Sequence, residues 1–249
     1  MKIVEKHLSK SFDKDLTELI ELFIDMGNMV IKSASDATHA LTDSDDELAK
    51  QVIECDDEVN QLEMKIDELV LLIVAKRQPV ANDLRLVMAI SKGVVDLERV
   101  GDESVKIAKM ASELVAQGNS PKGYAEVQHL SNQVRLMMLD ALTAFSQADP
   151  EMALKVMRSD ANVNLEYQTA PRSLMTYIME DSKHVGKVIN ILWVLRALER
   201  IGDHARNIAE LVIYYSSGTD VRHNDLLYAE EAVRQIIENG QQNQCNGIP

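Results

Sequence analysis

Apolar side chains recur every three or four residues along most of this chain. From about Asp13 to Ala40 the series includes Leu16, Leu19 and Phe23, and this spacing lines one face of an α-helix. Equivalent patterns predict five further long helices, over about 46–75, 82–117 and 126–147, from Pro150 onward, and over about 185–216.

Turn and cap residues separate these helices. Gln78-Pro79 ends the second helix, and Gly118–Gly123 is the clearest linker in the chain. Asp149 is placed to cap the fifth helix, with Pro150 in its first turn. Pro171 lies inside that helix, where it removes a backbone hydrogen bond, so we expect a kink in the turn before it.

The end of the chain is patterned more weakly. Leu226–Ile237 predicts one short amphipathic helix. Gln241–Gln244 is polar and lacks an apolar face, which predicts disorder.

The string Leu-Glu-Arg-hydrophobic-Gly-Asp occurs twice, at Leu97–Asp102 and at Leu198–Asp203, an offset of 101 residues. Other matches, such as Asp56 with Asp160, occur at an offset of 104. Self-similarity of this kind indicates an internal repeat. The predicted fold is all-α and elongated, with two repeat-related three-helix bundles at 1–119 and 120–218. Residues 219–249 form a C-terminal extension that we expect to be partly disordered.

The charge of the chain restricts its partners. Asp and Glu number 40 against 26 Lys and Arg, which gives a net charge of −14. Nucleic-acid phosphates and anionic lipid surfaces would be repelled. Metal cations and basic protein surfaces fit better. The longest strongly apolar run, Leu69–Ala75, is too short to span a bilayer. With no signal peptide and no disulfide framework from its two cysteines, we expect a cytoplasmic protein without membrane insertion.

Each repeat places two carboxylates one helical turn apart. These pairs are Glu98 with Asp102, and Glu199 with Asp203, and like charges at this spacing are mildly destabilising. Each pair flanks a glycine in the middle of the apolar stripe, where glycine permits another helix to approach closely. Carboxylates that converge at such a point suit a hard cation with oxygen ligands. We therefore predict a metal site at each pair.

Other interpretations of these acids stay open. The pairs could form a solvated face, in which Arg99 pairs with Glu103 and Arg200 with its own neighbours. Asp36 and Asp140 are also repeat-equivalent and lie on apolar stripes. They could complete a metal shell, but we prefer simple bonding to a nearby arginine or hydroxyl.

Catalytic motifs are missing from the chain. Glu126–His129 is the single Glu-x-x-His match, whereas di-iron carboxylate bundles need two. His204 is expected at the surface. No nucleophile, phosphate loop or acid–base pair is recognisable, so we predict that the protein is not an enzyme.

The duplicated motif closely resembles the PhoU family. So do Ala75–Pro79, Asp83–Met88, Leu174–Asp181 and the Tyr214-Tyr215 pair. The resemblance extends from about residue 5 to residue 225.

The resemblance implies two PhoU-type three-helix bundles, commonly in a homodimer. It implies a negative regulator of the phosphate-starvation response that also restrains phosphate uptake. Expected partners are the ATPase subunit of the phosphate ABC transporter and a phosphate-responsive sensor histidine kinase. It also implies metal clusters at Glu-x-x-x-Asp motifs, here Glu98/Asp102 and Glu199/Asp203, with iron, zinc, manganese or magnesium all plausible.

We expect a non-catalytic adaptor whose bound metal is structural or bridges to a partner or to phosphate. The alternative is a metalloenzyme, either a carboxylate-bridged oxidase or a metal-dependent phosphatase that acts on the kinase–regulator pair. A purely structural bundle is a third possibility.

Overall fold

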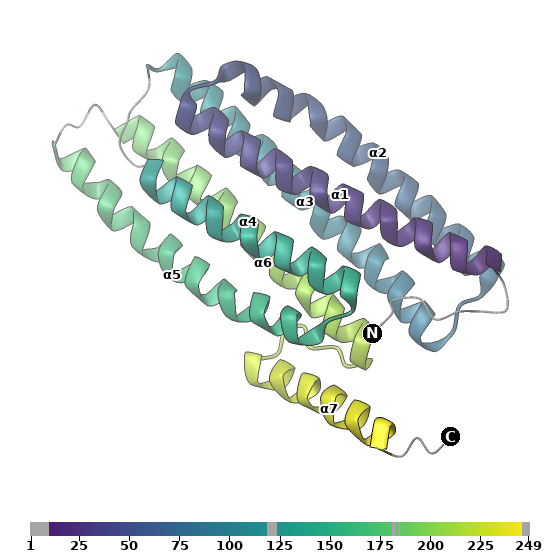
Figure 1. The fold of residues 1–249 in the computed structure, drawn as a ribbon. Helices are drawn as coiled ribbons and strands as arrows, with labels where there is room; N and C mark the ends of the chain where they lie inside the picture. Colours follow the sequence, from purple (N-terminus) through teal and green to yellow (C-terminus); the bar gives the residue numbers. More distant parts are fainter. Residues whose placement is uncertain (1–9, 119–123, 181–182, 184, 246–249) are drawn as a thin grey trace.

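The computed structural model describes residues 10–118, 124–180, 183 and 185–245. Within this part of the chain, the regular structure is seven α-helices (Figure 1). They are α1 (Lys10–Asp43), α2 (Asp46–Arg77), α3 (Ala81–Ala116), α4 (Tyr124–Gln147), α5 (Pro150–Glu180), α6 (Val185–Ser217) and α7 (Leu226–Cys245). The ends predicted for the first six agree with these to within about three residues.

Local side-chain chemistry determines where several helices begin. Asp45 precedes α2 and its carboxylate accepts a hydrogen bond from the backbone N–H of Leu48 at 3.0 Å. Asp149 does the same for α5, where it accepts from Glu151 and Met152, both at 3.0 Å. Each bond satisfies a backbone donor that the helix itself leaves unpaired.

The six long helices form two halves of three helices each. In each half the first two helices pack against the third, and α3 and α6 lie side by side at the centre (Figure 1). These two helices are antiparallel, because Arg200 reaches Glu103 while Asn190 reaches Glu113. Gly101 and Gly202 therefore lie near the middle of the central pair. Further contact between α1 and α4 joins the halves into one continuous core.

Aromatic side chains tie the two halves together at this core. The rings of Phe23 on α1 and Phe145 on α4 have centroids 4.6 Å apart. Phe145 also packs edge-on against Tyr215 of α6 at 5.1 Å, and the Tyr215 hydroxyl donates to the Phe145 carbonyl at 2.6 Å. Aromatic pairs stabilise beyond their buried area by roughly 0.5–1.5 kcal/mol.

The C-terminal extension differs from expectation. Helix α7 continues past Ile237, the end predicted for it, to Cys245 and so includes Gln241–Gln244; the partial disorder expected of residues 219–249 stays a prediction. Glutamine has a high helix propensity, so a helix that is already anchored extends through it at little cost. The anchor is contact with α5 and α6, including an ion pair of Arg158 with Glu230 at 2.6 Å.

Helix α5 runs through Pro171 without interruption, and the expected kink stays a prediction. None of the described helices combines the length and the apolar character that crossing a membrane requires.

Candidate metal centre

The glycine of each motif is a point of close helix contact. A Cβ at Gly101 would lie 3.2 Å from Asp56 Oδ1 and 3.4 Å from a methyl group of Val59, both on α2. A Cβ at Gly202 would lie 3.2 Å from a methyl group of Val163 on α5. The prediction that another helix approaches both glycines is confirmed. The carboxylates beside each glycine are therefore held against the neighbouring helix.

The first cluster combines acids from α3 and α2. Glu98 and Asp102 of α3 lie near Asp56 and Glu63 of α2, close enough for their charges to interact. Burial, and then repulsion by Asp102 and Glu63, raises the pKa of Glu98 above its usual value. Burial and the Asp102 charge likewise raise the pKa of Asp56. Unfavourable ionisation of this kind marks a site that lacks positive charge.

The first cluster lacks direct cation partners in the part of the chain that the structure describes. Among the described residues, no hydrogen bond or ion pair connects Glu98, Asp102 or Glu63 to a lysine, arginine or histidine. Asp56 accepts one long hydrogen bond, 3.4 Å, from the Asn60 amide. The four carboxylates are thus compensated only by more distant charges, such as those of Arg99 and Lys109.

The second cluster has three equivalent acids, because Tyr167 stands where the first cluster has Glu63, and its electrostatic balance differs. Glu199 pairs with Arg196 at 2.7 Å, and Asp160 of α5 accepts from Arg206 at 3.2 Å. Burial followed by the Asp203 charge raises the pKa of Glu199. Burial followed by the Asp160 charge raises the pKa of Asp203.

The repeat relationship explains this asymmetry. Arg196 and Arg206 occupy the positions that Val95 and Val105 hold in the first repeat, 101 residues earlier. The two halves therefore share the framework of the clusters but differ at these two positions. As a result, within the described part of the chain, only the first cluster is left without bonded positive charge.

The donor set of both clusters fits a hard metal ion. It consists of carboxylate oxygens, with an asparagine beside each Asp at Asn60 and Asn164. Asp160 is buried, and its Oδ1 has no hydrogen-bond partner, so it has a lone pair available for a cation. The side chains are not drawn together, however, since in the described part of the chain no three acidic, histidine or cysteine residues converge on one point.

Among the described residues, Asp36 and Asp140 form no ion pair or hydrogen bond with either cluster. Asp140 forms an ion pair with Lys155 of α5 at 2.8 Å. The simpler interpretation named an arginine or a hydroxyl as the partner of this residue, whereas the partner in the structure is a lysine. Asp36 is half-buried on α1.

The structure corrects the expectation for His204. It is buried rather than exposed, and its Nδ1 lies 2.8 Å from Asp96 Oδ1 on α3. Arg200, which would pair within its own helix in the solvated-face alternative, contacts Glu103 on α3 at 2.8 Å. Both side chains face the partner helix of the central pair, which a single-helix pattern does not reveal.

Sequence reasoning missed the acids that α2 and α5 contribute. Asp56 and Asp160 were identified as repeat markers, not as site residues, although each lies opposite the motif glycine or acid. Their repeat equivalence, together with Asn60 and Asn164 four residues later, was the available signal.

Comparison with known proteins decides the family. The sequence profile described as "PhoU domain" matches residues 23–111 and 127–212. The chain belongs to the PhoU family. The two matches coincide with the two repeats, and each includes one Glu-Arg-hydrophobic-Gly-Asp motif.

Relatives of the PhoU family match nearly the whole chain. The chain is 51% identical to the phosphate-specific transport system accessory protein PhoU homolog of Pseudomonas aeruginosa, over 91% of the chain and 94% of that protein. It is 42% identical to the phosphate-specific transport system accessory protein PhoU of Escherichia coli, over 88% of the chain and 91% of that protein.

Two crystal structures share the fold. That of PhoU from Pseudomonas aeruginosa matches with a TM-score of 0.81 at 51% identity, covering 84% of this chain and all of that one. The phosphate transport system regulatory protein PhoU from Streptococcus pneumoniae matches with a TM-score of 0.77 at 28% identity, covering 84% and 99%. The family is regulatory and not catalytic, so the metalloenzyme alternative is not retained.

The raised pKa values predict how Glu98→Gln changes stability. In metal-free protein at pH 7, Glu98 is ionised in an unfavourable setting, so the variant should be more stable by about 0.5 kcal/mol, or about 1–2 °C. A carboxyl whose folded pKa is raised contributes stability below its unfolded pKa and loses it as pH rises through the folded value. The advantage of the variant should therefore disappear near pH 4.

Thermal unfolding of wild type and variant between pH 4 and pH 8, with a chelator present, measures this difference. Glu68→Gln, at an exposed position of α2, is the matched control and should show no such pH dependence. A Glu98→Gln variant that is less stable than wild type at pH 7 would contradict the electrostatic description of the cluster.

Proposed function

We propose that this protein is a cytoplasmic negative regulator of the phosphate-starvation response that also restrains phosphate uptake. It acts as an accessory protein of a phosphate-specific transport system. The observation that carries the proposal is the match of both repeats to the PhoU domain, in a chain that spans nearly the full length of relatives named for that system.

In this proposal the protein is an adaptor. It connects the ATPase subunit of the phosphate ABC transporter with a phosphate-responsive sensor histidine kinase, and it works as a homodimer. The long helices and the net charge of −14 support such a role, because they offer extended helix faces to basic partners.

Metal binding is part of the same proposal. Glu98 and Asp102 with Asp56 would hold one ion, and Glu199 and Asp203 with Asp160 another; Asp36 and Asp140 are not assigned to either. A bound divalent cation would neutralise the buried acids and stabilise the contacts of α2 with α3 and of α5 with α6. The oxygen-only donor set favours manganese or magnesium, while iron and zinc remain compatible with it.

The asymmetry of the clusters predicts unequal metal affinity. Glu98→Gln/Asp102→Asn should remove more bound manganese than Glu199→Gln/Asp203→Asn, because arginines already neutralise the second cluster. Elemental analysis after incubation with manganese and gel filtration gives the stoichiometry, and far-UV circular dichroism checks that the helices persist. Unchanged manganese content in a variant that combines all four substitutions would refute the metal sites.

The regulatory role predicts a clear phenotype. Deletion of the gene should derepress phosphate-starvation genes in phosphate-rich medium, because the signal that restrains the kinase is lost. A transcriptional reporter for one such gene measures the effect, and the wild-type gene on a plasmid should restore repression. Continued repression in the deletion strain would show that the protein does not have this role.

A further inference from the structure

In each repeat, apolar side chains are exposed at equivalent positions near the connection between its last two helices, α2 and α3 in the first repeat and α5 and α6 in the second. Leu71 on α2 is 70% exposed, and its equivalent Met175 on α5 is 54% exposed. Met88 on α3 is 38% exposed, and its equivalent Ile189 on α6 is 45% exposed. Single exposed apolar residues are common on proteins, but a set that is present in both repeats calls for a functional explanation.

Two more exposed apolar side chains, Val74 on α2 and Leu84 on α3, lie on the same helix faces as the carboxylates. Leu84 precedes Asp102 by eighteen residues on α3, and Val74 follows Asp56 by eighteen on α2. Eighteen residues make five full turns of an α-helix, so the two members of each pair point in the same direction. The apolar and acidic residues therefore form one stripe along each helix.

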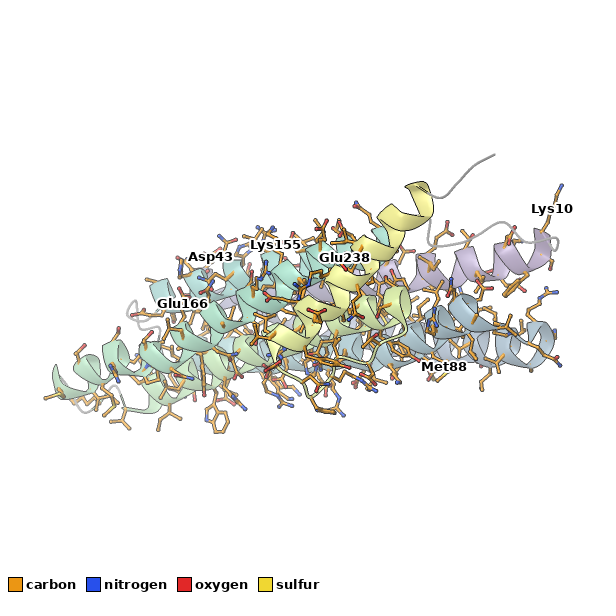
Figure 2. The ribbon with its side chains drawn as sticks, turned by 90° about the horizontal axis from the view of Figure 1, so that it is seen from below. Lys10, Asp43, Met88, Lys155, Glu166 and Glu238 are labelled. Carbon is orange, nitrogen blue, oxygen red and sulfur yellow. The ribbon has the colours of Figure 1, made fainter. Side chains whose placement is uncertain are left out.

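The antiparallel register of α2 and α3 places the apolar residues side by side. Asp56 lies against Gly101, and Glu63 lies near Glu98. Continuing this register by about two turns along both helices brings Leu71 opposite Met88. Figure 2 shows Met88 at the outer edge of the bundle, on the edge opposite the one that carries Asp43, Lys155 and Glu166.

The result is one surface with an apolar end and an acidic end. We call it the docking face, and it consists of Leu71, Val74, Leu84, Met88, Glu63 and Glu98. Contiguous exposed apolar surface next to unpaired charge marks an interaction site more often than a plain solvated surface. The described acids here have no bonded cation, so a partner could supply one.

Charge decides which occupant fits this surface. A second copy of the chain that docked face to face would set Glu63 and Glu98 against their own counterparts, and these like charges would repel. An anionic lipid surface is disfavoured in the same way. We propose that the docking face binds a basic amphipathic helix of a partner protein, with its apolar residues between α2 and α3 and its Lys or Arg side chains on Glu63 and Glu98.

This inference deepens the proposed function and rests on it, because it names the surface and the chemistry through which an adaptor would contact its partner. The second repeat offers a weaker version of the same surface. Tyr167 replaces Glu63 there, and Arg196 pairs with Glu199. The first repeat is therefore the main docking site.

Peptide binding tests the proposal directly. The probe is a synthetic, fluorescently labelled 18-residue helix with leucines on one face and lysines elsewhere, titrated with the full-length protein in EDTA. Leu71→Ser/Met88→Ser and, separately, Glu63→Gln/Glu98→Gln should each weaken binding about tenfold or more. The substituted side chains are not part of the core, and circular dichroism checks the fold.

Matched controls separate docking from general attraction to an acidic protein. Leu136→Ser/Leu227→Ser removes side chains that are 51% and 72% exposed on α4 and α7, helices without contact to α2 or α3 within the described structure. Glu47→Gln/Glu58→Gln removes two exposed acids from other faces of α2. These controls should change affinity by less than about twofold.

Equal weakening in the controls would overturn the proposal, because binding would then depend on overall charge or hydrophobicity. Conversion of a dimer to a monomer by Leu71→Ser/Met88→Ser, seen by light scattering, would show that a second copy covers this face. Loss of binding to phosphatidylglycerol vesicles in that variant would assign the face to lipid. Either result would also overturn the proposal.

The reporter strain distinguishes this inference from the proposed function. If the wild-type gene restores repression, Leu71→Ser/Met88→Ser should fail to do so while Leu136→Ser/Leu227→Ser succeeds. Restoration by both variants would refute the docking face and leave the regulatory role intact. Failure of the wild-type gene itself would refute the regulatory role.

Discussion

The close contact of helices at Gly101 and Gly202 is the constraint on which the rest of the structure depends. Because neither glycine has a side chain, α2 and α5 pack directly against the backbones of α3 and α6. Glycine within a helix costs roughly 1 kcal/mol relative to alanine, and the packing of Val59 and Val163 offsets this cost. The carboxylates beside each contact cannot separate without loss of that packing.

The two halves use this shared framework differently. In the second half, arginines bond Glu199 and Asp160, so that cluster is partly neutralised within the chain. In the first half the corresponding positions are valines, and the repulsion persists. The two repeats thus share their geometry, but among the described residues the acids of the first repeat have no bonded cation. A metal ion or a basic partner would supply the missing positive charge, so the metal site and the docking face use the same carboxylates.

Much of the fold follows from local sequence. Capping by Asp149, a proline at the first turn of α5 and the apolar spacing of each segment are short-range features, and they located six helices. The core stripe of α3 and the role of its glycine were also predictable, because helical periodicity alone places Gly101 among buried residues. The family resemblance, which depends on ordered motifs, was confirmed by the full-length matches.

What the sequence did not reveal depends on contacts between distant residues. His204 is buried because Asp96, on another helix, accepts its hydrogen bond, and nothing near His204 in sequence signals this. The contribution of Asp56 and Glu63 depends on the register of α2 against α3. The length of α7 depends on its anchoring to α5 and α6, whereas its glutamine-rich end resembles a disordered tail.

The central claim is that the first carboxylate cluster is the stronger cation site of the two. Substoichiometric Mn²⁺ added to isotopically labelled, metal-free protein tests it, because this ion broadens the amide NMR signals of residues close to it. The account predicts that signals of residues 98–102 and of Asp56 broaden before those of residues 199–203 and of Asp160. Simultaneous broadening of both sets, earlier broadening of the second, or no selective broadening at either cluster would contradict it.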